Sequence, residues 1–185
     1  MKKVVIGFFI FLAVLLALAA LVPVLFKDKI KQALDKEIAK NINATVVYET
    51  DDVSLSLFRD FPNLSLGVDN LSIIGKDSFQ TDTLAQIPSF RMGLNLASVV
   101  SGDELKVNSI TLDEPTIRLI VLKSGKANWD IFIEDTTTTE ADTAASDFSM
   151  AIKGWKINNG TLYYDDLSIP FGVALYGVNH TGSGD

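Results

Sequence analysis

The sequence predicts a mainly β protein with an N-terminal transmembrane helix, a short amphipathic helix and a curved, open antiparallel sheet. Three observations predict this fold class. Residues 4–26 form an apolar run without a charge, residues 27–43 follow a helical period, and residues from 44 onward alternate with a period of two. These changes of pattern divide the chain into an anchor with a short cytoplasmic start (1–26), a helix (27–43) and a β-rich domain (44–185).

Composition argues against several classes of function. Residues 1–43 hold 7 lysines and 3 acidic residues, a net charge of +4, whereas residues 44–185 hold 9 basic and 20 acidic residues, a net charge of -11. Nucleic-acid binding needs a concentrated basic face, which an acidic domain does not offer. The chain has no cysteine and one histidine, His180, which argues against disulfides, thiol nucleophiles and multi-histidine metal sites. We therefore expect a protein that is not an enzyme, with no catalytic residue, no metal site and no cofactor.

The apolar leader predicts a membrane anchor. A helix of residues 4–26 would be ~34 Å long at ~1.5 Å per residue, enough to cross a ~30 Å hydrocarbon core. A cleaved signal peptide is the alternative, with an A-x-A pattern at Ala17–Ala19. The apolar run continues past that pattern to Phe26, which favours an uncleaved anchor. Two lysines precede the run and five follow it, so the charges alone leave its orientation open.

The segment 27–43 predicts an amphipathic helix. Its apolar residues recur at spacings of three and four, at Ile30, Ala33, Leu34, Ile38 and Ile42. Two interpretations follow from this pattern. The helix packs on its own domain, or it lies at the membrane surface or closes one end of a groove.

Alternating apolar and polar residues predict strands at 53–57, 64–68 and 90–96, and a run rich in β-forming residues predicts another at 116–122. Proline removes a ladder donor, so we expect Pro62, Pro88, Pro115 and Pro170 to mark the ends of strands. Residues 134–147 contain four consecutive threonines among acidic residues and no large apolar side chain. That composition predicts a flexible surface loop.

Apolar residues with a spacing of two, three and two recur four times in the β-rich domain. The repeated positions are Leu66, Val68, Leu71 and Ile73; Leu105, Val107, Ile110 and Leu112; Met150, Ile152, Trp155 and Ile157; and Val173, Leu175, Val178 and His180. Each step of three contains a glycine or an asparagine: Asn70, Asn108, Gly154 and Gly177. One extra residue in a strand predicts a β-bulge or kink that returns the next pair to the same face. Successive bulges bend a sheet into a trough.

The apolar face of this trough has two interpretations. It is an ordinary core, covered by a second sheet or by the helix at 27–43, because a one-sided sheet normally buries its apolar face. Alternatively, part of the face stays open as an apolar channel for acyl chains.

Four segments in order resemble a known family: residues 62–73 (PNLSLGVDNLSI), 105–122 (LKVNSITLDEPTIRLIVL), 125–132 (GKANWDIF) and 150–166 (MAIKGWKINNGTLYYDD). They resemble the N-terminal part of AsmA-family proteins, which are similar to chorein-type bridge-like lipid-transfer proteins. The most characteristic part is Pro115 followed by Gly125, Asn128 and Trp129. The chain ends in mid-pattern at 182–185, so we expect it to be the N-terminal portion of a longer protein.

The resemblance implies a single-pass anchor in the bacterial inner membrane and a periplasmic β domain. It implies a groove, or β-taco, that guides phospholipid between the inner and outer membranes, with membrane lipids and envelope proteins as partners. The alternative is an assembly or scaffold factor for outer-membrane proteins that acts through its strand edges. The candidate groove residues are Leu66, Val68, Leu71, Ile73, Leu105, Val107, Ile110, Leu112, Ile152, Trp155 and Ile157.

Overall fold

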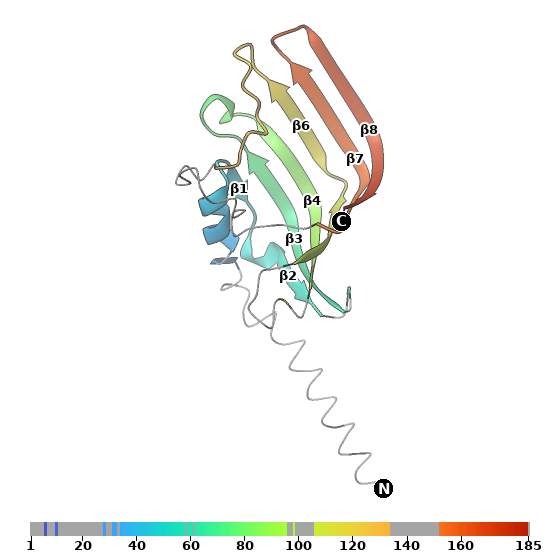
Figure 1. Cartoon of the computed structure of the whole chain (residues 1–185). Helices are drawn as coiled ribbons and strands as arrows, with labels where there is room; N and C mark the ends of the chain where they lie inside the picture. Colours follow the sequence, from blue (N-terminus) through green and yellow to red (C-terminus); the bar gives the residue numbers. More distant parts are fainter. Residues whose placement is uncertain are drawn as a thin grey trace, which may run out of the picture.

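The structure of the protein is a computed structural model (Figure 1). It describes residues 34–57, 59–60, 62–95, 106–133 and 152–184, together with Ile6, Ile10, Asp28, Lys31, Gln32 and Ser98. The loop predicted at 134–147, Leu105, Met150 and nearly all of the predicted anchor lie outside the described residues. Within the described part of the chain, no helix has the length and apolar content that a membrane crossing requires.

The protein is mainly β, with one eight-stranded sheet and little helix. The strands are β1 (Thr45–Val47), β2 (Val53–Ser56), β3 (Asn63–Ile74), β4 (Thr83–Asn95), β5 (Val107–Asp113), β6 (Thr116–Val121), β7 (Gly154–Asp166) and β8 (Phe171–Ser183). Two short 3-10 turns are η1 (Thr50–Asp52) and η2 (Asp77–Phe79). Residues 34–41, inside the range predicted for the amphipathic helix, are helical.

Several short strands share a neighbour and together act as one long strand. β1 and β2 both pair with β3, β1 through Thr45–Val47 and β2 through Val53–Ser56. β5 and β6 likewise both lie between β4 and β7. The sheet therefore runs from β1 and β2 at one edge, through β3, β4 and the β5–β6 pair, to β7 and β8 at the other edge. Figure 1 shows this curved sheet with β8 along its outer side.

The sheet is mixed, which corrects the prediction of a purely antiparallel sheet. β5 and β6 pair with β7 in parallel, whereas the other named pairs are antiparallel. A parallel pair needs a crossover connection of about a dozen residues or more. The long stretch between Val121 and Gly154 supplies that length, and the period of the strands carried no information about their direction.

Two of the predicted bulges are confirmed by the strand register. Between β4 and β5 the register shifts next to Gly93 and leaves Asn108 as the extra residue. Between β7 and β8 the register shifts at Gly177, whose φ of 63° glycine adopts without a steric cost. Both residues lie in the step of three of their repeats, as the spacing predicted.

The other two predicted positions behave differently. Asn70 has a φ of 52°, but the register of β3 with β4 is the same on both sides of it. Pro88 stands opposite, inside β4, so both strands are interrupted together; this corrects the prediction that Pro88 ends a strand. The bulge predicted at Gly154 is wrong, because Gly154 is the first residue of β7. The interruption of β7 lies instead at Asn159, with a φ of 50°.

These interruptions line up across the sheet and form a single crease. The crease consists of Asn70 in β3, Pro88 in β4, Glu114 and Pro115 between β5 and β6, Asn159 in β7 and Gly177 in β8. Asn70 Nδ2 donates to Asp52 Oδ1 at 2.9 Å and so continues the crease to η1, between β2 and β1. Each strand therefore bends at the same level, which gives the sheet a trough-like curve.

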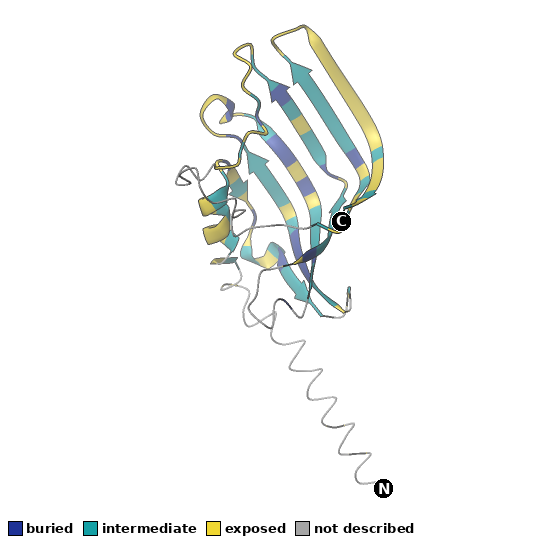
Figure 2. Ribbon diagram, viewed as in Figure 1, coloured by how far each residue is buried: buried dark blue, intermediate teal, exposed yellow. Residues whose placement is uncertain are grey.

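The core lies at the β1–β4 side of the sheet. Its centre consists of Tyr48, Val53, Leu66 and Val68, and the helical Leu34 and Ile38 pack against it. This contact supports the interpretation in which the helix packs on its own domain. Figure 2 shows buried residues concentrated in the inner strands, whereas β8 is exposed along most of its length.

Candidate functional site

Strand register gathers the apolar repeats into rows on one side of the sheet. Residues directly opposite one another on neighbouring strands share a face. One row is Val53, Val68, Phe90, Leu112, Ile157 and His180, and the next is Leu55, Leu66, Met92, Ile110, Trp155 and Gly182. We call this side the apolar face. The opposite side, which we call the polar face, carries the row Ser54, Gly67, Arg91, Thr111, Lys156 and Thr181.

The apolar face continues beyond the crease. There the row is Val46, Ile73, Ala85, Ile117, Leu162 and Leu175, running from β1 to β8. Val46 and Leu71 pack against the same core as Val53 and Val68, so the rows on the two sides of the crease lie on one face. We call the side that contains Val53 and Val68 below the crease and the side that contains Val46 and Leu71 above it. An apolar surface thus extends across the whole width of the sheet.

The exposed fraction of residues on the apolar face rises from the β2 edge of the sheet to the β8 edge. Val53 at the β2 edge is only 1% exposed, because the helix at 34–41 and its neighbours lie over it. Trp155 in β7 is 39% exposed and Leu175 in β8 is 46% exposed. The face is therefore buried at the β2–β3 side and most exposed on β7 and β8. The buried side fits the interpretation of an ordinary core, whereas the use of the exposed side by acyl chains stays a prediction.

The predicted groove residues fall into three groups. Leu66, Val68, Ile110, Leu112, Trp155 and Ile157 lie in the two rows below the crease, and Leu71 and Ile73 lie on the same face above it. Val107 is 3% exposed and belongs to the covered interior. Ile152 precedes β7 and is not in a row, and Leu105 lies outside the described residues.

Phe90 and Met92 of β4 link the apolar repeats of β3 and β5. Neither residue was among the predicted groove residues. Phe90 links Val68 to Leu112, and Met92 links Leu66 to Ile110. The alternation of residues 90–96 signalled a strand, but only the pairing of β4 between β3 and β5 shows that it completes the rows. Leu162 and Leu175 extend the face in the same way above the crease.

Trp155 covers the outer end of its row. It pairs with Gly182, where an added Cβ would lie 2.2 Å from the indole ring, so the ring lies across the glycine. The ring centroids of Trp155 and His180 are 6.2 Å apart. His180 thus belongs to an aromatic contact at the exposed β8 edge. The chemistry that this face offers is contact with hydrocarbon.

The model of the AsmA family matches residues 1–176, which is nearly the whole sequence. The chain belongs to the AsmA family. No curated protein and no solved structure matches it.

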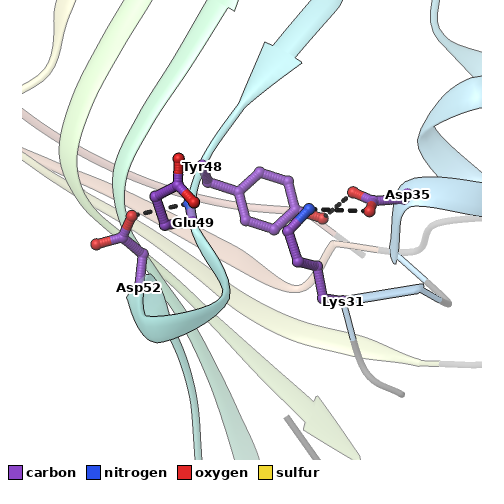
Figure 3. Close-up of polar contacts among 5 residues, drawn as sticks. All are labelled: Lys31, Asp35, Tyr48, Glu49 and Asp52. Atoms are coloured by element: carbon purple, nitrogen blue, oxygen red, sulfur yellow. Dashed lines mark hydrogen bonds and ion pairs between the residues drawn. The ribbon is translucent and has the colours of Figure 1, made fainter. Parts of the chain in front are cut away.

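In this AsmA-family chain, polar contacts fasten the helix over the covered half of the apolar face (Figure 3). Tyr48 Oη donates to Asp35 Oδ1 at 2.8 Å, and Lys31 Nζ lies 2.9 Å from Asp35 Oδ2 and 4.6 Å from the Tyr48 ring centroid. Hydrogen bonds from Lys31 and Tyr48 lower the pKa of Asp35. Burial, with the Asp35 bond, raises the pKa of Tyr48 far above its usual value. The helix is therefore held by a neutral phenol and an ionised carboxylate.

Two aspartates, Asp52 and Asp166, hold turns. Asp52 Oδ2 accepts the Glu49 backbone N–H at 2.9 Å, also drawn in Figure 3. This bond and that from Asn70 lower the pKa of Asp52. Asp166 accepts the backbone N–H of Ser168 at 2.9 Å in the β7–β8 turn. Each carboxylate already serves as a local acceptor for its own turn.

The Gly125–Trp129 segment that resembles AsmA proteins has a structural role here. Asn128, 2% exposed, accepts the Ile120 N–H at 2.9 Å and donates to the Arg118 carbonyl at 2.7 Å. Farther along, Asn43 N donates to Ile131 O at 2.6 Å and ties this segment to the end of the helix. The motif therefore connects β6 to the element that covers the core.

Proposed function

We propose that this AsmA-family chain is a non-catalytic, membrane-anchored envelope protein that guides phospholipid along its apolar face. The observation that carries the proposal is the set of in-register apolar rows, which are most exposed where they cross β7 and β8. Family membership is consistent with roles in envelope lipid transport or assembly. The anchor would be residues 4–26 in the inner membrane, with the β domain in the periplasm.

An apolar strip meets the main physical demand of lipid transfer. Each CH₂ group exposed to water costs ~0.8 kcal/mol, so a chain of ~16 carbons needs an apolar path worth on the order of 10 kcal/mol. Transfer along such a path changes no covalent bond. This explains how the chain could act without catalytic groups.

The path that we propose lies over β5, β7 and β8. Leu112, Ile157 and Leu175 are only partly covered there, whereas Leu66 and Val68 already contact the core beneath the helix. The tail would therefore lie on the open half of the face. The helix at 34–41 would close the opposite side of the trough.

A second candidate function rests on the β8 edge. Among the described strands, β8 pairs only with β7, and it exposes Phe171, Val173, Leu175 and Tyr176. An unpaired strand edge is a template for strand addition by another protein. An assembly or scaffold factor for outer-membrane proteins would use this edge.

Site-specific photocrosslinking in cells distinguishes the two candidates. A benzophenone amino acid is placed at Leu112, Ile157 or Leu175 in the full chain, and at Arg118 or Ala174 as controls. Neighbouring residues in a strand point to opposite faces, so Ala174 and Leu175 differ mainly in the face that they probe. The crosslinked protein is purified, digested and examined by mass spectrometry for lipid adducts.

Phospholipid adducts at the apolar-face positions and none at Arg118 or Ala174 would support guidance of lipid. Equal adducts at both sets would indicate general contact with the bilayer and would contradict the proposal. Protein adducts at Leu175 and Ala174 alike, without lipid at Ile157, would favour the strand-edge function.

A further inference from the structure

An open hollow of about 450 Å³ is lined mainly by residues of the polar face, together with Ile110, Trp155 and Gly182 from an apolar row. It lies below the crease, where β3, β4, β5, β7 and β8 meet the turn that contains Arg59 and Asp60. The strands contribute small or hydroxylated residues, among them Ser65, Gly93, Ser109 and Thr111. Because these side chains are short, the turn and the sheet leave space between them.

The hollow concentrates positive charge in an acidic domain. Three of the 9 basic residues in residues 44–185 line it, Arg59, Arg91 and Lys156, although this region has a net charge of -11. Among the described residues of the lining, Asp60 is the acidic one. Even when Asp69, the partner of Arg91, is included, the excess remains positive. A local excess of this kind attracts anions against the field of the whole domain.

Arg91 is held in a defined position at the centre of the polar row. Its Nη1 lies 2.7 Å from Asp69 Oδ1 and donates to the Phe90 carbonyl at 2.9 Å. Gly67 leaves room for the guanidinium, because a Cβ at position 67 would lie 3.0 Å from Nη1. With Nη1 engaged, Nη2 and Nε are the donors that a ligand would reach. A guanidinium fixed in this way loses little conformational entropy on binding.

The surrounding groups suit a tetrahedral oxyanion. Thr111 lies next to Arg91 in one cross-strand row, and Lys156 lies beyond Thr111 in the same row. Ser65 and Ser109 lie on either side of Gly93 in a second row of this face. These side chains supply ammonium, guanidinium and hydroxyl donors, and phosphate oxygens accept from all three. We propose that this hollow binds a phosphate group, either as inorganic phosphate or as the phosphodiester of a lipid headgroup. The proposal goes beyond the guidance of lipid along the apolar face, because it concerns the opposite side of the sheet.

The test is isothermal titration calorimetry of the full chain in a non-ionic detergent, without zwitterionic detergent. The probes are inorganic phosphate and glycerophosphoglycerol, a deacylated headgroup that has no tail to engage the apolar face. The variant carries Arg59→Gln and Lys156→Gln, both at exposed positions. The matched control carries Lys123→Gln and Lys126→Gln, which remove the same charge from the β6 turn outside the hollow. Circular dichroism checks that all three proteins are folded.

We expect saturable binding that weakens at least about tenfold in the Arg59/Lys156 variant and stays unchanged in the control. Tighter binding of glycerophosphoglycerol than of phosphate would identify a headgroup as the source, and the reverse order would identify free phosphate. Absence of saturable binding of either probe would overturn the proposal. Equal weakening in both variants would also overturn it, because the effect would then come from net charge. Neither result depends on whether lipid occupies the apolar face.

Discussion

At the scale of single residues, Asn128 links the characteristic AsmA segment to the stability of β6. Its buried amide satisfies the Ile120 N–H and the Arg118 carbonyl. We expect Asn128→Ala to lower the free energy of unfolding by about 2–3 kcal/mol, because both backbone groups lose their partner in a buried setting. Urea unfolding of the full chain, followed by circular dichroism, measures this change. The exposed neighbour Asp130 provides the control, since Asp130→Ala should change stability by less than about 0.5 kcal/mol. Similar losses in both variants would contradict this role.

The resemblance drew attention to the segment containing Asn128 but did not reveal what the residue does. Its partners lie 8 and 10 positions earlier in the chain, and their backbone groups come within reach only when the segment folds back on β6. Spacing along the sequence carries no such information. By contrast, the steps of three that contain Asn70 and Gly177 did predict kinks, and both residues adopt the positive φ that asparagine and glycine tolerate.

Asp35 gives the helix attachment a dependence on pH. Hydrogen bonds from Lys31 and Tyr48 hold the pKa of this carboxyl below its usual value of 3.8. A lowered carboxyl pKa contributes stability that is present above the usual value and is lost as the pH falls through the lowered value. We therefore expect Asp35→Asn to be less stable than the wild type at neutral pH, with a difference that shrinks below pH ~4.

The measurement is urea unfolding of both proteins over a series of pH values. Asp52 and Asp166 also have lowered pKa values and titrate in the same range. The difference between wild type and variant isolates Asp35, because the other two carboxyls are common to both. A difference that stays constant as the pH falls would show that the ionised carboxylate does not hold the helix.

At the scale of elements, the crease depends on residues that accept a left-handed backbone. Asn70 has a φ of 52° and also bonds to Asp52. Both Asn70→Gly and Asn70→Ala lose the side-chain bond to Asp52, but only the alanine variant keeps a Cβ in a left-handed conformation, which costs roughly 1–2 kcal/mol. We expect the alanine variant to be less stable than the glycine variant by about 1 kcal/mol, as measured by urea unfolding.

Ser72, two residues farther along β3, is the control for this comparison. It lies in regular pairing with Val47 and Gln86, away from the crease. There the order should reverse, with Ser72→Ala more stable than Ser72→Gly, because glycine weakens a strand interior. The same order at both positions would mean that the crease is not maintained by the backbone conformation of Asn70.

The alignment of the kinks into one crease could not be predicted from the sequence. The spacing predicted the interruptions at Asn70 and Gly177, which lie in the crease, and the one at Asn108, which lies outside it. It failed at Gly154, because an apolar spacing does not indicate where a strand begins. Glu114 and Asn159 adopt a positive φ without lying in a step of three. Their role follows from the neighbouring strands, which bend at the same level.

At the scale of the whole molecule, the two sides of the apolar face differ in how deeply their residues are buried. The sequence predicted that the repeats share a face and left open whether the face is a core or a channel. That question depends on where the helix lies, and contacts of Leu34 and Ile38 with the core place it over β1–β4. The parallel pairing of β7 was likewise unpredictable, because a period of two is the same in either strand direction.

The two halves of this face should therefore respond differently to a buried charge. Val68 is 5% exposed beneath the helix, so Val68→Asp should cost several kcal/mol and unfold the domain. Leu175 is 46% exposed on the open half, so Leu175→Asp should cost less than about 1 kcal/mol. Urea unfolding of the full chain measures both changes. On the proposed function, the folded Leu175→Asp protein should also lose lipid crosslinking at Ile157, because a carboxylate interrupts the apolar strip. Retention of those adducts would separate the lipid path from the β8 edge, and unfolding of both variants would show that the open half is covered in the intact protein.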